Sequence, residues 1–168
     1  MNVGTHTRRL SANAAVVASV FEGVTLEQAR WKPDGGWSML EVLNHLCDEE
    51  RDDFRQRLDL TLHHPSQEWP PIDPEGWATQ RAYNQRDLQP SLADFLAERR
   101  RSVEWLRSLH SPDLTIARRH PQGFELRAGD LLASWIAHDL GHVRQIVEIQ
   151  RQYLAATALP FSIEYAGS

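Results

Sequence analysis

Apolar residues recur at three- and four-residue steps along four long stretches of the chain, which is the spacing of one face of an α-helix. The stretches cover about residues 5–23, 38–62, 91–109 and a last one from 128 or 129 to about 155. No run of alternating strands separates them. Four long amphipathic helices predict an all-α fold, in the form of a four-helix bundle.

Two of these helices open with the signature of a capping box, in which a Ser side chain and an acid three residues later satisfy each other's free backbone N–H groups. Ser38 and Glu41 form this pair at the start of the second helix. Ser91 and Asp94 repeat the pattern in the third. We therefore place these two helix starts at the serines.

The connectors on either side of the third helix are long. Residues 63–74 hold four prolines and predict a loop, residues 74–87 add a short helix, and the segment before residue 128 predicts a small hairpin around Pro121-Gln122-Gly123. Both connectors exceed the 2–8 residues usual in bundles, which allows at least one to cross the bundle. No internal boundary interrupts the pattern, so residues 1–168 are interpreted as a single domain.

Charge and composition narrow the possible partners. The net charge is −5, which argues against nucleic acid, and the basic run Arg99-Arg100-Arg101 is interpreted as a solvated helix face. The single cysteine, Cys47, excludes an internal disulfide and follows the apolar stripe, so we predict that it packs in the core. The N-terminal segment lacks the apolar core of a signal peptide, and no stretch is long and apolar enough to span a bilayer. A cytoplasmic protein without a membrane partner is expected.

Two histidines occupy positions on the fourth helix where the pattern demands apolar residues. The seam consists of Leu131, Trp135, His138, His142, Gln145 and Ile149. His138 and His142 share one face, so both imidazoles can reach one ion. Because burying imidazoles without partners is costly, either a metal or a hydrogen-bond network must satisfy them.

A third ligand would come from the second helix, where His45 is the best candidate. It lies at the edge of the apolar arc, which suits a site near the bundle surface but also plain exposure. Glu49, one turn later, is a candidate weak fourth ligand or base. Glu41 and Asp139 could orient an imidazole, although we prefer the capping role for Glu41 and leave a solvent-facing Asp139 equally open.

The remaining candidates are given structural roles. Trp135, one turn before His138, is a possible wall of the site. His6 is expected either at the surface or in the N-terminal turn, and the other histidines are expected at the surface: His63, His64, His110 and His120. The chain has no Glu-x-x-His pair of the kind that a di-iron bundle uses.

Two segments carry a family resemblance. "WSMLEVLNHLCDEERDDF" resembles the second-helix signature of DinB-like metal-binding bundles, and "HPQGFELRAGDLLASWIAHDLGHVRQI" resembles their fourth-helix signature. The likeness covers nearly the whole chain. It implies an up-down-down-up topology and a divalent metal, most often nickel or zinc, held by His45, His138 and His142. It also implies a homodimer.

The resemblance implies chemistry as well. Some relatives transfer low-molecular-weight thiols such as bacillithiol, mycothiol or glutathione onto electrophiles. Three neutral imidazoles leave an open coordination position, where a metal would keep such a thiol deprotonated. We therefore expect a metal-dependent enzyme, in the first place a transferase that uses a small thiol and an electrophile, with a hydrolase-like enzyme left open. The alternatives are a non-catalytic metal-binding stress-response protein and a bundle without metal.

Overall fold

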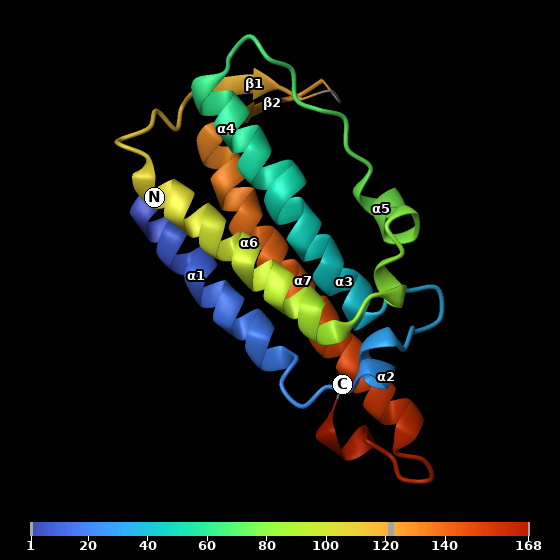
Figure 1. Ribbon diagram of the computed structural model, residues 1–168. Helices are drawn as coiled ribbons and strands as arrows, with labels where there is room; N and C mark the ends of the chain where they lie inside the picture. Colours follow the sequence, from blue (N-terminus) through green and yellow to red (C-terminus); the bar gives the residue numbers. More distant parts are fainter. Residues whose placement is uncertain (1, 121–122, 168) are drawn as a thin grey trace.

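Four long helical segments lie side by side in the computed structural model, which describes residues 2–120 and 123–167 (Figure 1). The first is α1 (Val3–Val20), and the second is a continuous rod of α3 (Met39–Asp48), η1 (Glu49–Arg55) and α4 (Gln56–His63). The third and fourth are α6 (Leu88–Ser108) and α7 (Ala128–Thr157). The predicted all-α four-helix bundle is confirmed.

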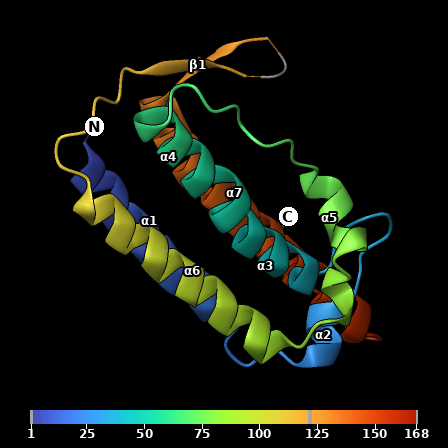
Figure 2. The ribbon, with the colours of Figure 1, turned by 45° about the horizontal axis from the view of Figure 1, so that its top comes forward.

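The order of directions along the bundle is up-down-down-up, as the resemblance implied. Helices α1 and α7 run one way, whereas the α3–α4 rod and α6 both run the other way (Figures 1 and 2). Two successive rods can be parallel because the connector after α4 returns along the whole bundle. It carries α5 (Pro74–Gln80) and the short helix η2 (Tyr83–Gln85).

Local hydrogen bonds determine where the helices begin. The Ser38–Glu41 capping box is confirmed: Ser38 Oγ accepts from Glu41 N at 3.1 Å, and Glu41 Oε2 accepts from Ser38 N at 2.8 Å. The second predicted box was wrong. Helix α6 begins at Leu88, and Ser91 is a buried interior residue of it. Pro90 sits in the first turn, where its missing N–H costs no helical bond.

Three smaller features differ in how the sequence predicted them: one helix is longer than predicted, one was not predicted, and the hairpin is confirmed. Helix α1 begins two residues before its predicted start because the Asn2 side chain accepts from Thr5 N at 3.0 Å. The short helix α2 (Leu26–Arg30) was not predicted. The hairpin is confirmed as antiparallel strands β1 (Ala117–Arg119) and β2 (Glu125–Arg127). Its predicted turn at residues 121 and 122 lies outside the described residues.

The middle of the second rod is a π-helix, which the sequence pattern did not predict. Over Glu49–Arg55 the turns are wider than in an α-helix. As a result two adjacent acids, Glu49 and Glu50, are both buried, and so are Asp53 and Phe54 one turn later. The π-helical segment therefore supplies carboxylates to the bundle interior.

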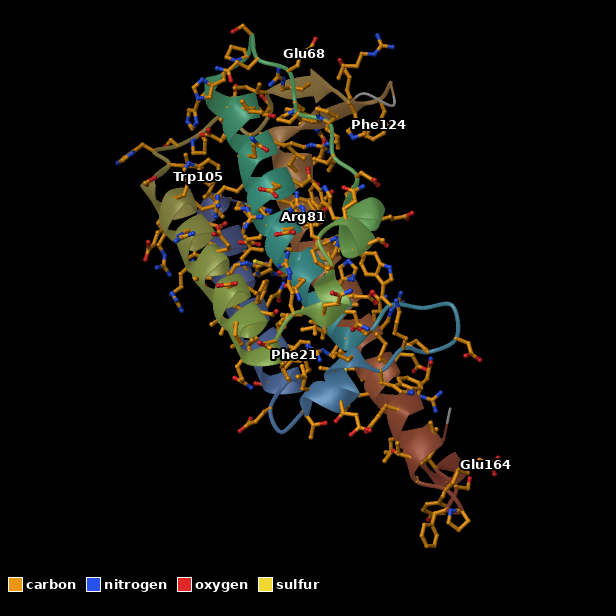
Figure 3. The ribbon with its side chains drawn as sticks, turned by 45° about the vertical axis from the view of Figure 1, so that its right-hand side comes forward. Phe21, Glu68, Arg81, Trp105, Phe124 and Glu164 are labelled. Atoms are coloured by element: carbon orange, nitrogen blue, oxygen red, sulfur yellow. The ribbon has the colours of Figure 1, made fainter. Side chains whose placement is uncertain are left out.

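A polar layer divides the apolar core into two clusters. One cluster includes Phe21 and the other is flanked by Trp105, near opposite ends of the bundle (Figure 3). Between them the Arg99 side chain is only 1% exposed and binds Asp139 at 2.7 and 2.8 Å and Glu50 Oε1 at 2.8 Å. The interpretation of Arg99 as part of a solvated face was therefore wrong, and so was the solvent-facing alternative for Asp139.

None of the helices in the described ranges has the length and apolar character needed to cross a membrane.

Candidate metal centre

Three imidazoles from two helices converge at one point beside the polar layer. His138 Nε2 lies 3.2 Å from His45 Nε2 and 3.1 Å from His142 Nε2. These three residues form the group of described side chains that could hold a metal ion, with all ligand atoms within 4.8 Å of one another. Glu49 is not part of that group.

The nitrogen spacing fits a single cation. Two imidazole nitrogens at about 2.0–2.1 Å from a tetrahedral ion lie about 3.3–3.4 Å apart. The Nε2 separations of 3.1 and 3.2 Å come close to this value without any movement of the helices. Three such ligands occupy three of four tetrahedral positions, so the fourth would face the adjacent groove.

Neighbouring side chains orient two of the three rings. The Gln145 side-chain oxygen lies 2.7 Å from His142 Nδ1 and accepts a hydrogen bond from it. Because the proton of the ring is then on Nδ1, the Nε2 lone pair is free for a metal. Trp37 packs edge-on against His45 with ring centroids 5.0 Å apart. His45 Nδ1 is buried and has no hydrogen-bond partner among the described residues. Thus His45 is held by packing, and His142 by a hydrogen bond.

Burial keeps the imidazoles neutral, which is the form that binds metal. The pKa of His45 falls to about 3, first because of burial and then because of His142, against a smaller opposing effect of Asp48. Burial, His142 and His45 together lower the pKa of His138 to about 2. For His142 burial lowers the pKa, and the Gln145 hydrogen bond offsets only part of that.

Aromatic rings support the centre from behind. Trp135 is 1% exposed and stacks on Phe54 with centroids 5.5 Å apart. Phe54 in turn meets His138 edge-on at 5.2 Å. Trp135 also donates its indole N–H to Glu50 at 2.8 Å. Trp135 therefore contacts the histidines only through Phe54 and is itself bonded to the polar layer. Trp37, in contrast, lines the groove.

A groove with two lobes of about 780 and 640 Å³ opens over the histidines. Both lobes share His138 and His142, together with Trp37 and Gln145. The first lobe continues past Glu49 to the start of α5, and the second follows α7 toward its C-terminal half. The open side of the centre is therefore accessible to a small molecule.

Glu49 is a protonated acid on the wall of the first lobe. Its side chain is only 4% exposed, and burial, followed by the nearby Asp53 carboxylate, raises its pKa to about 9. A hydrogen bond with Asp53 contributes to the shift, and Arg57 opposes it. At neutral pH the Glu49 carboxyl therefore keeps a proton, which is hydrogen-bonded to Asp53, on the wall of the groove.

The other candidates lie away from the centre. Glu41 is used in the capping box and also binds Lys32 at 2.9 Å. Cys47 is buried in the core, as predicted, and burial raises its pKa to about 12. His63, His64 and His110 are exposed and His120 is half-buried. His6 lies in the first turn of α1, as one of its two alternatives predicted, and it is not at the surface, because it is 2% exposed and its Nδ1 lies 2.9 Å from Asn2 O.

A buried anion beside His45 was missed by the sequence analysis. Asp48 accepts from Tyr83 Oη at 2.6 Å, from Arg81 Nη1 at 2.6 Å and from Arg51 Nη2 at 2.8 Å. Figure 3 shows Arg81 on the connector where it passes the second rod. These bonds attach the connector to α3 one turn from His45. Residues 72–75 of the same connector line the first lobe, so this side of the lobe is held in place. Arg81 and Tyr83 lie more than thirty positions from Asp48, so a local sequence pattern could not predict their contact with it.

Comparisons with known proteins show which family this chain resembles. The model of the DinB superfamily matches residues 9–146. Two curated relatives carry the name "Putative metal-dependent hydrolase". OB0782 of Oceanobacillus iheyensis is 27% identical over 116 residues, 68% of this chain and 66% of that protein. YfiT of Bacillus subtilis is 27% identical over 121 residues, 71% of this chain and 67% of that protein. The alignments thus span about two thirds of each relative.

A solved structure supports the fold. It is described as "YfiT from Bacillus subtilis is a probable metal-dependent hydrolase with an unusual four-helix bundle topology". It matches with a TM-score of 0.80 at 23% identity, covering 90% of this chain and 87% of that chain. Because the family model spans α1 through most of α7, including all three histidines, the chain belongs to the DinB superfamily.

Proposed function

We propose that the protein is a divalent-metal-dependent enzyme that transfers a low-molecular-weight thiol onto an electrophile. The observation that carries the proposal is the set of three neutral Nε2 atoms within 3.2 Å of their neighbours, facing an open groove. His45, His138 and His142 would hold the ion, and zinc and nickel both accept imidazole ligands. A bound divalent ion would lower the pKa of a thiol at the open position and so supply the thiolate.

The chain's own residues supply orientation and a proton. Gln145 fixes the His142 tautomer, and Trp37 and Phe54 restrict the His45 and His138 rings. Glu49 holds a proton on the groove wall at neutral pH. We assign it the role of acid toward the leaving group of the electrophile, rather than that of a fourth ligand or of a base.

Hydrolysis is the second candidate, and the names of the two relatives favour it. The same three ligands with water in place of a thiol would suit a hydrolase. A water-activating base must be ionised, however, whereas Glu49 is protonated at neutral pH. Water bound to the same ion could itself ionise near neutral pH without such a base, so both reactions stay candidates and an assay must separate them. A non-catalytic metal-binding protein is the remaining alternative.

The decisive experiment compares these reactions on one preparation. Protein purified without an affinity tag is analysed for metals, stripped, and reloaded with zinc or nickel. It is then assayed with bacillithiol, mycothiol or glutathione plus monobromobimane, and in parallel with p-nitrophenyl acetate without thiol. We expect metal-dependent bimane conjugation with at least one thiol, and its loss in His142→Ala but not in His110→Ala, whose histidine is exposed.

Each other outcome has a clear meaning. Ester hydrolysis without conjugation supports the hydrolase instead. Stoichiometric metal without either activity supports the non-catalytic protein. A preparation that binds no metal, with His142→Ala behaving as wild type, removes the metal centre and both enzymatic candidates.

A further inference from the structure

The two lobes of the groove differ in charge, and the histidines lie where they meet. The first lobe is lined by two carboxylates, Asp73 and Glu75, by the protonated acid Glu49, and by no lysine or arginine among the described residues. The second lobe contains Arg144, which is the only lysine or arginine among the described residues that line either lobe. A ligand in this groove therefore experiences opposite charge on its two sides.

Arg144 differs from its neighbours because its charge is not used inside the protein. Its side chain is exposed, and within the described residues it makes no ion pair or side-chain hydrogen bond. By contrast, Arg151 lies two turns later and binds Glu148 at 3.1 Å. Glu148, the one acid that lines the second lobe, is therefore already occupied. Arg144 keeps its guanidinium available for a ligand.

The acidic lobe disfavours an anion. Asp73 is used as the cap of α5, with Gly76 N at 3.0 Å and the Gln80 amide at 3.1 Å. Glu75 is exposed and has no ion-pair partner among the described residues, so it contributes an uncompensated negative charge at that end. A negatively charged group would be repelled there and attracted toward Arg144. The charge pattern thus orients a ligand as well as binding it.

We propose that Arg144 recognises a carboxylate on the thiol cosubstrate, so that carboxylate-bearing thiols are the substrate class. This inference rests on the proposed function. The sulfur lies at the three histidines, and the carboxylate extends along α7 into the second lobe. Guanidinium is suited to this role because its planar donors match the two oxygens of a carboxylate.

The test uses two thiols that differ in their terminal group, the anionic carboxylate of 3-mercaptopropionate and the neutral amide of 3-mercaptopropionamide. Each is titrated calorimetrically into zinc-loaded protein, and the metal content is measured afterwards. We expect the carboxylate to bind about five- to tenfold more tightly than the amide, since the guanidinium is exposed and partly screened. Arg144→Gln should abolish this preference, while leaving the affinity for the amide unchanged.

Two variants make the test specific. Arg144→Lys keeps the charge but not the planar donors, so part of the preference should survive. Arg100→Gln removes a charge from an exposed position on α6 outside the groove and should retain all of it. Equal affinity for the two thiols in wild type overturns the role of Arg144 and leaves thiol transfer standing. Equal weakening of both thiols by Arg144→Gln also overturns it. Failure of both thiols to bind overturns the inference and the thiol function together.

Discussion

At the scale of single residues, Glu49 is the side chain whose role can be isolated most cleanly. Glu49→Gln keeps the shape of a protonated carboxyl but removes the proton that can be donated. We expect conjugation with an epoxide, whose ring oxygen must gain a proton as its C–O bond breaks, to fall about 100-fold or more, within the range typical of lost acid–base catalysis. Conjugation with monobromobimane, which loses bromide and needs no proton, should change little. Metal content, measured by elemental analysis, should stay at the wild-type value. A variant that loses its metal would instead make Glu49 a ligand.

Cys47 gives a prediction that needs no ligand. Its thiol is buried and its pKa is raised from 9.0 to about 12, so at pH 8 the thiolate fraction is reduced about 1,000-fold. Reaction with Ellman's reagent should therefore be slower in the native protein by at least about that factor, and fast in guanidinium chloride. Cys47→Ala should retain conjugation activity. Fast labelling of the native protein would show that this side of α3 opens.

The sequence predicted single residues well where one helix determines the answer. His138 and His142 interrupt an apolar seam, so their inward position follows from periodicity alone. His45 was the best candidate on its own helix, but its position at the edge of the apolar arc left exposure equally open until the resemblance completed the set. Arg99 was misplaced for a physical reason. A guanidinium is buried only if acids from other helices meet it, and Glu50 and Asp139 lie at least 40 positions away.

At the scale of elements, the π-helical segment is anchored to α6 by a charged contact. Arg55 donates to Glu98 Oε2 at 2.6 Å and to Ser102 Oγ at 3.0 Å, and Arg101 also binds Glu98. Burial alone would raise the pKa of Glu98, but the bonds with Arg55 and Arg101 outweigh it and leave the pKa below its usual value. The ionised carboxylate therefore stabilises the folded chain.

This contact predicts a pH dependence of stability. A carboxylate whose pKa is depressed by folding contributes stability above its unfolded pKa of about 4.3, and this is lost as the pH falls through the folded value. Glu98→Gln should therefore lower the free energy of unfolding at pH 7 by about 1 kcal/mol. The difference from wild type should shrink as the pH falls from 7 to 3, in urea melts at each pH.

A matched control lies on the same helix. Glu104 is exposed, so Glu104→Gln should leave unfolding unchanged at both pH values. A Glu98→Gln penalty of equal size at pH 3 and pH 7 would mean that packing rather than charge carries the contact.

The elements themselves were predictable only as far as local rules reach. The Ser38–Glu41 capping box was predicted correctly. The Ser91–Asp94 pair has the same spacing, but the helix begins three residues earlier, at Leu88. The wide turns at Glu49–Arg55 leave no mark in the sequence, since no proline or glycine lies there. Their effect is to bury Glu49 and Glu50 together, and Glu50 meets Arg99 of α6, a contact between helices that periodicity cannot express.

At the scale of the whole molecule, the topology depends on the connector between α4 and α6. Its length allowed a crossing, but only the family resemblance specified which pair of helices runs parallel. The structure adds the reason that the connector stays in place: Arg81 and Tyr83 bind Asp48, and Asn84 accepts from Ser38 Oγ at 2.7 Å. The same contacts hold the connector whose residues 72–75 line the first lobe of the groove, so the topology and the site depend on one another. The homodimer stays a prediction.

The last prediction concerns the stability of the entire bundle with metal. His45 lies on the second rod and His138 and His142 on α7, so an ion held by all three joins two helices and binds the folded state alone. At a metal concentration 100 times the dissociation constant this adds about 2.7 kcal/mol. For a domain of this size the Tm should rise by about 5–10 °C on adding zinc or nickel to stripped protein, measured by calorimetry. His142→Ala should show little of this rise, and His110→Ala all of it. A rise of equal size in wild type and His142→Ala would place the ion elsewhere on the chain, because only a centre that uses His142 can link the two helices in this way.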